Sequence, residues 1–335
     1  MHASWSVSET LVDGCVERQL GLAPAWLRHE VAPRRLRDAA ERQVREDLAR
    51  VANIEFAREF RRACPLAGAE LEDYAFKLLP IGVAQWLVTS LRFRGGDLDW
   101  PFVQIDHSTI SIVDRNGWEI VERALADAYA HLAPRAIRIF DPDDGELRAL
   151  SHRRVACDVR IFAATLGQLR SVELPPSSTA IEVTRVEAVS SDSYARYREV
   201  YEELRGRSPI HRPRSVWHEE QDDLSAAARN GLVVEVHLDG EWAGLFAYTP
   251  TSELFFDGLC VLEAALTAAA RGRGLAAHVH RRMADLVDAP DDAVLYGHVV
   301  EGNEPSARAA MRAGRRLSGA YRFVDLRGWR PRSRV

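Results

Sequence analysis

The feature that most constrains the fold of this chain is a glycine-rich turn at residues 271–276, with the sequence RGRGLA. A strand-like run at residues 254–262 precedes the turn, and a helical run with apolar side chains at helical spacing follows it to residue 287. Gly272 and Gly274 lack a Cβ, so the backbone can bend tightly and a ligand can come close. The first N–H groups of a helix have no partner within it and lie at the positive end of its dipole. The turn therefore predicts an anion site at a helix start.

The chain downstream of this turn alternates between strand and helix. Residues 293–300 form a second strand-like run, and Asn303 follows it closely. A short helix is expected over residues 305–313, with Gly314 as its C-terminal stop. A last extended run, residues 320–327, completes an α/β pattern.

The segment upstream of the turn completes the second half. Residues 181–186 alternate like a strand, and residues 193–204 and 221–229 show helical spacing. Residues 232–248 contain two alternating segments around an Asp-Gly dipeptide at 239–240, which is a strong hairpin signal. The predicted order is strand, two helices, hairpin, strand, glycine turn, helix, strand, helix, strand.

This order and the turn together resemble the GNAT superfamily of acyl-CoA-dependent N-acyltransferases. The signature of that family is Gln/Arg-x-x-Gly-x-Gly/Ala, and Arg271, Gly274 and Ala276 occupy its fixed positions. A strand, an Asn and a helix ending in Gly come next in the family, and Asn303 matches that Asn. The resemblance covers about residues 178–335. It implies an α/β fold with a mixed, mostly antiparallel central sheet flanked by helices.

The resemblance also implies a ligand and a reaction. An acyl-CoA, with acetyl-CoA as the expected co-substrate, would donate its acyl group to a primary amine of a small molecule by direct attack. Its pyrophosphate would lie on the glycine turn, and its pantetheine arm would lie where the fourth strand of the family fold splays from the fifth. The implied cofactor contacts are Cys260, Val261, Leu262, Arg271, Gly272, Arg273, Gly274, Leu275, Ala276 and Asn303.

The sequence departs from the family pattern at three places. Many members carry a Tyr seven residues after the Asn as the acid that protonates the leaving thiolate, but Ala310 stands there. Arg315 stands where an aromatic residue usually follows the Gly. The connector over residues 262–271 is several residues longer than usual, and we expect a short helical turn in it. Tyr321 and Tyr296 are candidate replacement acids, and a packed tyrosine is the alternative for each.

Three residues are candidates for a general base. Asp257 lies within an apolar strand run, where burial would raise the pKa of an unpaired carboxyl. His298 is on the strand next to the expected cleft, and Glu301 is at the end of that strand. A hydrogen-bonded strand residue or a solvated strand end is the alternative for each. Cys260 is a conceivable nucleophile, but a lone strand cysteine is more often a small core residue.

The amine acceptor site is expected between the first two helices of the second half. This segment mixes cations, an aromatic residue and carboxylates, which suits a small polar amine and equally suits an exposed loop. Its candidate residues are Arg205, Arg207, His211, Arg212, Arg214, Trp217, His218, Glu219 and Glu220.

A connector at residues 173–179, with two adjacent prolines and small polar residues, predicts two similar-sized domains, 1–174 and 175–335. In the first half, residues 34–62 show the spacing of one long amphipathic helix. Strand-like and helical runs follow in an order that loosely repeats the second half. The first half is thus either a degenerate GNAT-like copy or an unrelated α/β domain. A near-signature at residues 92–97 has Asp97 in its sixth position and is expected to be a plain turn.

Charge and cysteine usage limit the function classes. The net charge of −5 over 335 residues gives no overall basic field for nucleic acid. The four cysteines are scattered, with no metal-ligand spacing, so no metal is expected. No secretion signal and no membrane-spanning run is recognisable, so a cytoplasmic protein without membrane association is expected.

The sequence therefore predicts a GNAT-type N-acetyltransferase whose first half has lost any cofactor site. A GNAT fold that binds CoA without catalysis, as a sensor or assembly module, is one alternative, and the residue at Ala310 favours it. A transferase that uses aminoacyl-tRNA is a further alternative, which the acidic charge balance and intact phosphate signature disfavour. Strand edges in this family often pair, which leaves a homodimer open.

Overall fold

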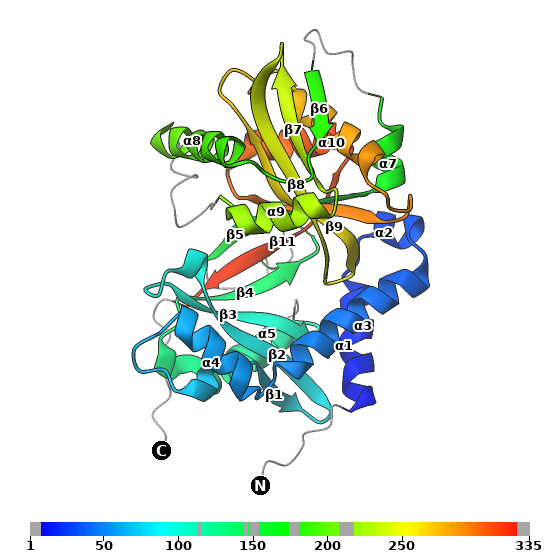
Figure 1. Ribbon diagram of the computed structural model, residues 1–335. Coiled ribbons are helices and arrows are strands. Elements are labelled where there is room, and N and C mark those ends of the chain that lie inside the picture. Colours follow the sequence, from blue (N-terminus) through cyan, green and yellow to red (C-terminus); the bar gives the residue numbers. More distant parts are fainter. Residues whose placement is uncertain are drawn as a thin grey trace.

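The computed structural model describes residues 8–112, 115–143, 147, 154–173, 181–207 and 218–326. Within these residues, strands from both halves of the chain form a single 11-stranded sheet with helices on both of its faces (Figure 1). The strand order is β1-β2-β3-β4-β11-β5-β10-β9-β8-β7-β6. The predicted fold class, a mixed and mostly antiparallel sheet flanked by helices, is confirmed.

The first half supplies the strands β1–β5. Most of its helices lie in the lower part of Figure 1. In chain order its helices and strands are α1 (Glu9–Gly21), α2 (Ala25–Glu30), α3 (Pro33–Ala49), α4 (Ile54–Ala63), β1 (Lys77–Gly82), β2 (Gln85–Phe93), β3 (Pro101–Ser108), α5 (Arg115–Tyr129), β4 (Ala136–Asp141), β5 (Val155–Thr165) and α7 (Leu166–Ser171).

The second half follows the order that its sequence predicts. Its elements are β6 (Ile181–Arg185), α8 (Ser191–Arg207), α9 (Gln221–Arg229), β7 (Val233–Leu238), β8 (Glu241–Glu253), β9 (Phe256–Leu266), α10 (Leu275–Leu286), β10 (Val294–Val300), α11 (Glu304–Arg312) and β11 (Arg316–Asp325).

Each half contributes its last strand to the other half of the sheet. β5 pairs antiparallel with β10, from Thr165 opposite Val294 to Val159 opposite Val300. β11 pairs antiparallel with β4, and β11 and β5 also pair with each other. The segment around the expected 174/175 boundary lies outside the described residues, but the hydrogen-bonded sheet continues across the two halves.

The two halves share an element order around a parallel strand pair. In the first half β3 and β4 pair in parallel, with α5 between them in sequence. In the second half β9 and β10 pair in parallel, with α10 between them. In both halves an antiparallel hairpin partner precedes the first of these strands. The loose repeat seen in the sequence is therefore present in the strand topology.

One local prediction was wrong. The helix expected over residues 34–62 is two helices. The first ends at Ala49, Ala52 has a left-handed φ of 53°, and Asn53 caps the start of α4, its side chain accepting from the Phe56 N–H at 3.0 Å. The helical turn expected in the connector at residues 262–271 is present after β9 ends at Leu266: the N–H groups of Ala270 and Arg271 both donate to the Thr267 carbonyl, at 3.0 and 3.1 Å. The near-signature at residues 92–97 is the expected plain turn, with a short 3₁₀ segment at Arg94–Gly96.

Separate apolar clusters hold the helices against the sheet. The largest in the second half joins α8, α9 and α10 to β7–β9. Its counterpart in the first half joins α5 to β2–β4 and includes Val324 of β11. Of the helices described, none has both the length and the apolar character needed to cross a bilayer.

Candidate active site

The candidate site is an opening between β9 and β10. The two strands pair at three positions, from Gly258 opposite Val294 to Cys260 opposite Tyr296. Beyond this point β9 continues to Leu266 and β10 to Val300, and a cavity of about 600 Å³ lies between and beside them. Backbone N–H and C=O groups on such unpaired edges are available to a ligand. This is the strand splay that the family resemblance implies.

Residues from five elements and one turn line this cavity. β9 and β10 form its inner walls, the 271–276 turn and α10 form one side, and α8 and α11 contribute at its rim. Its lining includes Tyr201, Val261, Leu262, Glu263, Arg271, Gly272, Gly274, Leu275, Ala276, His280, Gly297, His298, Asn303, Arg308, Arg312 and Arg315.

The outer end of the cavity has the geometry of an anion site. Gly274 is the N-cap residue of α10 with a left-handed φ of 78°, and no side chain caps this helix. The N–H groups of the first turn are therefore left for a ligand. A Cβ placed on Gly274 would lie 3.7 Å from Nη1 of Arg312. A guanidinium beside the positive end of a helix is a repulsive arrangement that a bound anion would turn into an attractive one.

Arg271 braces the turn and does not reach freely into the cavity. Its Nε donates to the Leu266 carbonyl at 2.7 Å, and its Nη2 pairs with Glu203 of α8 at 3.0 Å. Arg273 is exposed and lies outside the cavity lining. Asn303 lines the cavity, and its side-chain oxygen caps α11 by accepting from the Ser306 N–H at 3.3 Å.

Glu263 is an ionisable residue at the cavity that was not among the predicted site residues. Its side chain is buried, with 6% of the residue exposed, and it accepts from the hydroxyl groups of Tyr197 and Tyr201 on α8. Burial raises the pKa of Glu263 to about 7, although these two hydroxyls and the Ala264 N–H favour the charged form. The signal in the sequence was a single carboxylate within the apolar run 259–270.

His298 lies on the cavity wall as part of a pair with Glu253. Its Nε2 is 3.0 Å from a Glu253 carboxylate oxygen, and 34% of its side chain is exposed. Burial alone would lower the pKa of His298, but Glu253 and the neighbouring Cys260 raise it to about 10. The imidazole therefore holds its proton at neutral pH and has no free lone pair for the role of base.

Tyr321 and Tyr296 lie behind this pair, outside the cavity lining. The Tyr321 hydroxyl donates to the other Glu253 oxygen at 2.9 Å. Burial, followed by the Glu253 charge, raises the pKa of Tyr321 well above its ordinary value. Burial likewise raises the pKa of Tyr296, which stacks on Phe256.

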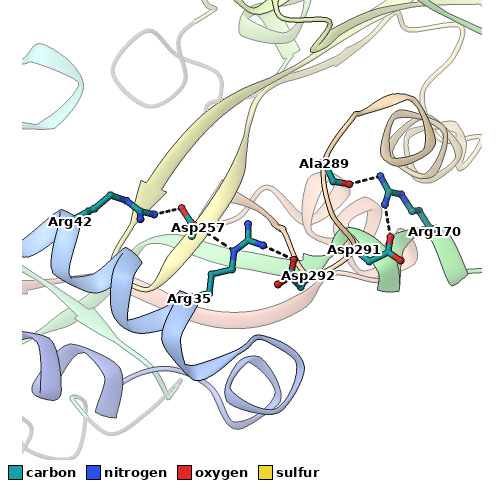
Figure 2. A network of polar contacts seen from close by, with 7 residues as sticks. All are labelled: Arg35, Arg42, Arg170, Asp257, Ala289, Asp291 and Asp292. Carbon is teal, nitrogen blue, oxygen red and sulfur yellow. Dashed lines mark hydrogen bonds and ion pairs between the residues drawn. The ribbon is translucent and has the colours of Figure 1, made fainter.

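Asp257 is held in a network far along β9 from the cavity opening. Figure 2 shows its carboxylate between Arg35 and Arg42 of α3, while Arg35 also pairs with Asp292. Glu301 pairs with Arg160 of β5 at 2.9 Å and is half-exposed. Neither carboxylate lines the cavity.

The structure thus separates the predicted site residues into two groups. Brought together on the cavity are Val261, Leu262, Arg271, Gly272, Gly274, Leu275, Ala276, His298 and Asn303. Outside its lining are Asp257, Cys260, Arg273, Glu301 and Tyr321. Of the acceptor segment, residues 208–217 lie outside the described residues. Nowhere in the described ranges do three or more His, Cys, Asp or Glu side chains gather as a metal site.

The corresponding opening in the first half is nearly closed. β3 and β4 pair at three positions, Phe102–Gln104 opposite Ala136–Arg138. The residues beyond, together with α1 and Leu254 of the second half, enclose a cavity of only about 40 Å³. Side chains of α1, including Cys15 and Gln19, line this space.

Comparisons with known proteins give matches at the level of structure only. No known family model matches the chain, and no curated protein sequence does. A GCN5-related N-acetyltransferase from Sphaerobacter thermophilus is similar at 15% identity, with 83% of this chain and 91% of that one covered and a TM-score of 0.47. One from Kribbella flavida is similar at 14% identity, 83% and 95% coverage and a TM-score of 0.42.

A tandem GNAT protein from the clavulanic acid biosynthesis pathway is also similar, at 14% identity, with 71% of this chain and 77% of that one covered and a TM-score of 0.37. All three likenesses lie at or below 15% identity and below a TM-score of 0.5.

Proposed function

We propose that this protein is an acyl-CoA-dependent N-acyltransferase that acylates the primary amine of a small molecule. The observation that carries the proposal is the cavity between β9 and β10. One end of it is an uncapped helix start with Arg312 beside it, and its walls are unpaired strand edges. An elongated ligand with an anionic head and amides along its arm fits both features.

Glu263 is the proposed general base. A carboxyl group with a pKa near 7 can take a proton from an ammonium acceptor at neutral pH and release it afterwards. The neutral amine then attacks the thioester carbonyl carbon, and open backbone N–H groups along β9 are suited to the developing oxyanion. Collapse of the tetrahedral adduct breaks the C–S bond and leaves the thiolate, and the nitrogen releases its extra proton to water to give the neutral amide.

His298 is the proposed source of a proton for that thiolate. It is protonated at neutral pH through Glu253 and lines the same cavity. This would supply the acid that Ala310 cannot provide. The small cavity between β3 and β4 supports a structural role for the first half, because α1 occupies the space that a pantetheine arm would need.

The first test is calorimetric titration of the full chain with acetyl-CoA, repeated on Gly274→Trp. Micromolar binding by the wild type that is lost in the variant supports the site, and a screen of small amines for CoA release then tests turnover. Failure to bind any CoA compound would sink the proposal. Binding of CoA without turnover of any amine would leave the alternative of a sensor or assembly module. Labelling of a substrate that requires aminoacyl-tRNA would support an aminoacyl-tRNA-dependent transferase.

A further inference from the structure

A further charged group at the cavity has no role in the reaction as proposed. Arg315 of the α11–β11 junction stands where the family resemblance predicts an aromatic residue, and it lines the cavity although only 5% of the residue is exposed. Its backbone N–H donates to the Ala310 carbonyl, which anchors it at the end of α11. A Cβ on Gly297 would lie 2.9 Å from Arg315 Nη1 and 3.0 Å from Cβ of Val261. The guanidinium therefore lies where β9 and β10 begin to separate.

The contacts of Arg315 leave its charge uncompensated. Its Nη2 donates to Nε2 of His280 at 3.1 Å, and the opposite nitrogen of that ring, Nδ1, is 2.8 Å from the Tyr248 hydroxyl. Burial first, and then the Arg315 charge, lower the pKa of His280 well below its ordinary value, so its ring is neutral. Burial raises the pKa of Tyr248, so its hydroxyl is neutral as well. Within the described part of the chain Arg315 pairs with no carboxylate, and its buried Nε has no partner. Burial lowers the pKa of Arg315 too, but a guanidinium stays charged at neutral pH.

The position of this charge is at the inner end of the cavity. Val261 precedes Leu266 by five residues on β9, which is a distance of about 17 Å along a strand. Leu266 lies next to the 271–276 turn through its contact with Arg271. A ligand whose anionic head occupies the α10 start would therefore bring its opposite, acyl end toward Arg315. A buried cation is costly unless the ligand supplies an anion.

We propose that the transferred acyl group ends in a carboxylate that pairs with Arg315, so that the donor is the CoA thioester of a dicarboxylic acid. This rests on the proposed function, since it assumes a CoA thioester in the same cavity. Neutral Tyr248 and His280 hold the guanidinium in place for this pairing. Gly297 leaves the space for it, because any Cβ there would displace Nη1.

The test compares matched thioesters on the full wild-type chain by calorimetric titration. Succinyl-CoA is compared with butyryl-CoA, and malonyl-CoA with propionyl-CoA, since each pair exchanges a terminal carboxylate for a methyl group. We expect the charged member of at least one pair to bind about tenfold tighter, as a buried charge-assisted hydrogen bond predicts. Equal or tighter binding of the neutral member in both pairs, with CoA itself bound, overturns this inference and leaves the proposed function standing. No binding of any CoA compound overturns both.

Two variants locate the preference. Arg315→Met should bring the charged thioester down to the affinity of its neutral partner, while Arg308→Met, an exposed arginine on the outer cavity wall, should weaken both members alike and keep their ratio. A full preference remaining in Arg315→Met contradicts the proposal. Gly297→Ala provides a second route if Arg315→Met does not fold, and it too should reduce the ratio.

Discussion

A carboxylate in the interior of a sheet needs donors, and Glu263 obtains three: two tyrosine hydroxyls from α8 and the N–H of Ala264. These donors lower the pKa of Glu263, and burial raises it. The result is a group that is close to half-protonated at neutral pH. The pKa of Glu263 near 7 therefore depends on burial and on these three donors together.

Glu263→Gln should reduce kcat by about 10²- to 10⁴-fold while leaving acyl-CoA affinity close to that of the wild type. The wild-type rate should rise with pH through about 7, since the base acts when deprotonated. Tyr201→Phe is the matched variant. It removes a hydroxyl that stabilises the charged form of Glu263, so the pKa of Glu263 should rise and the rising limb of the pH–rate profile should move to higher pH. A steady-state pH profile measures both, and an unchanged limb in Tyr201→Phe would speak against Glu263.

The pairing of His298 with Glu253 predicts a pH-dependent stability. The pKa of His298 is raised to about 10, so its contribution is fully present below the unfolded value of about 6.5 and is lost as pH rises through 10. The pKa of Glu253 is lowered, against the effect of burial, by His298 and Tyr321, so its contribution is lost as pH falls through that lowered value. Glu253→Gln should therefore cost more unfolding free energy at pH 6 than at pH 10 in urea titrations. An equal cost at both values would show that the pair does not titrate as described.

At the scale of an element, the start of α10 depends on backbone conformation more than on side chains. Gly274→Val should lower the free energy of unfolding by about 1–2 kcal/mol, because a left-handed φ is unfavourable for a residue with a Cβ. It should also abolish acetyl-CoA binding, since the N–H groups of the turn would change direction. Gly240→Val is the control: φ is 85° there, in the β7–β8 hairpin turn. Gly240→Val should lower stability by a similar amount and leave acetyl-CoA binding intact. Equal affinity for acetyl-CoA in the two variants would contradict the anion site.

The α3 helix is attached to β9 by the charges shown in Figure 2. Asp257→Asn should lower stability by on the order of 1 kcal/mol, as for other partly exposed ion pairs, and leave kcat within about twofold. Urea unfolding and an acylation assay measure the two effects. A drop in kcat of about 100-fold or more would restore Asp257 as the base.

The sequence predicted elements with a local signal and missed contacts made across the sheet. The glycine turn, the Asp-Gly hairpin and the helix stop at Gly314 depend on neighbouring residues, and the structure has each one. The partners of Glu263 come from α8, more than 60 residues earlier. The sequence pattern of β9 does not predict these partners. The long-range pairing of His298 with Glu253 was equally inaccessible.

At the scale of the whole molecule, the exchanged strands join the halves more firmly than a connector would. β11 carries Arg322, whose guanidinium pairs with Asp141 of β4, and both side chains are fully buried. Asp141→Asn should lower the free energy of unfolding by about 3–5 kcal/mol, because breaking a buried pair leaves a charge behind. Hydrogen exchange should show strands of both halves losing protection together, in one transition. Loss of protection in β1–β4 alone would indicate two independent units.

The central place of β11 also sets an order for folding during synthesis. β4 gains its neighbour only when residues 316–325 have been made, roughly 180 residues after β4 itself, which at about 5–20 residues per second is a delay of roughly 10–40 s. Throughout that interval one edge of the first half has unpaired backbone groups that can pair with other chains. Nascent chains of this protein therefore present, for a time, an unpaired strand edge of the kind that favours aggregation.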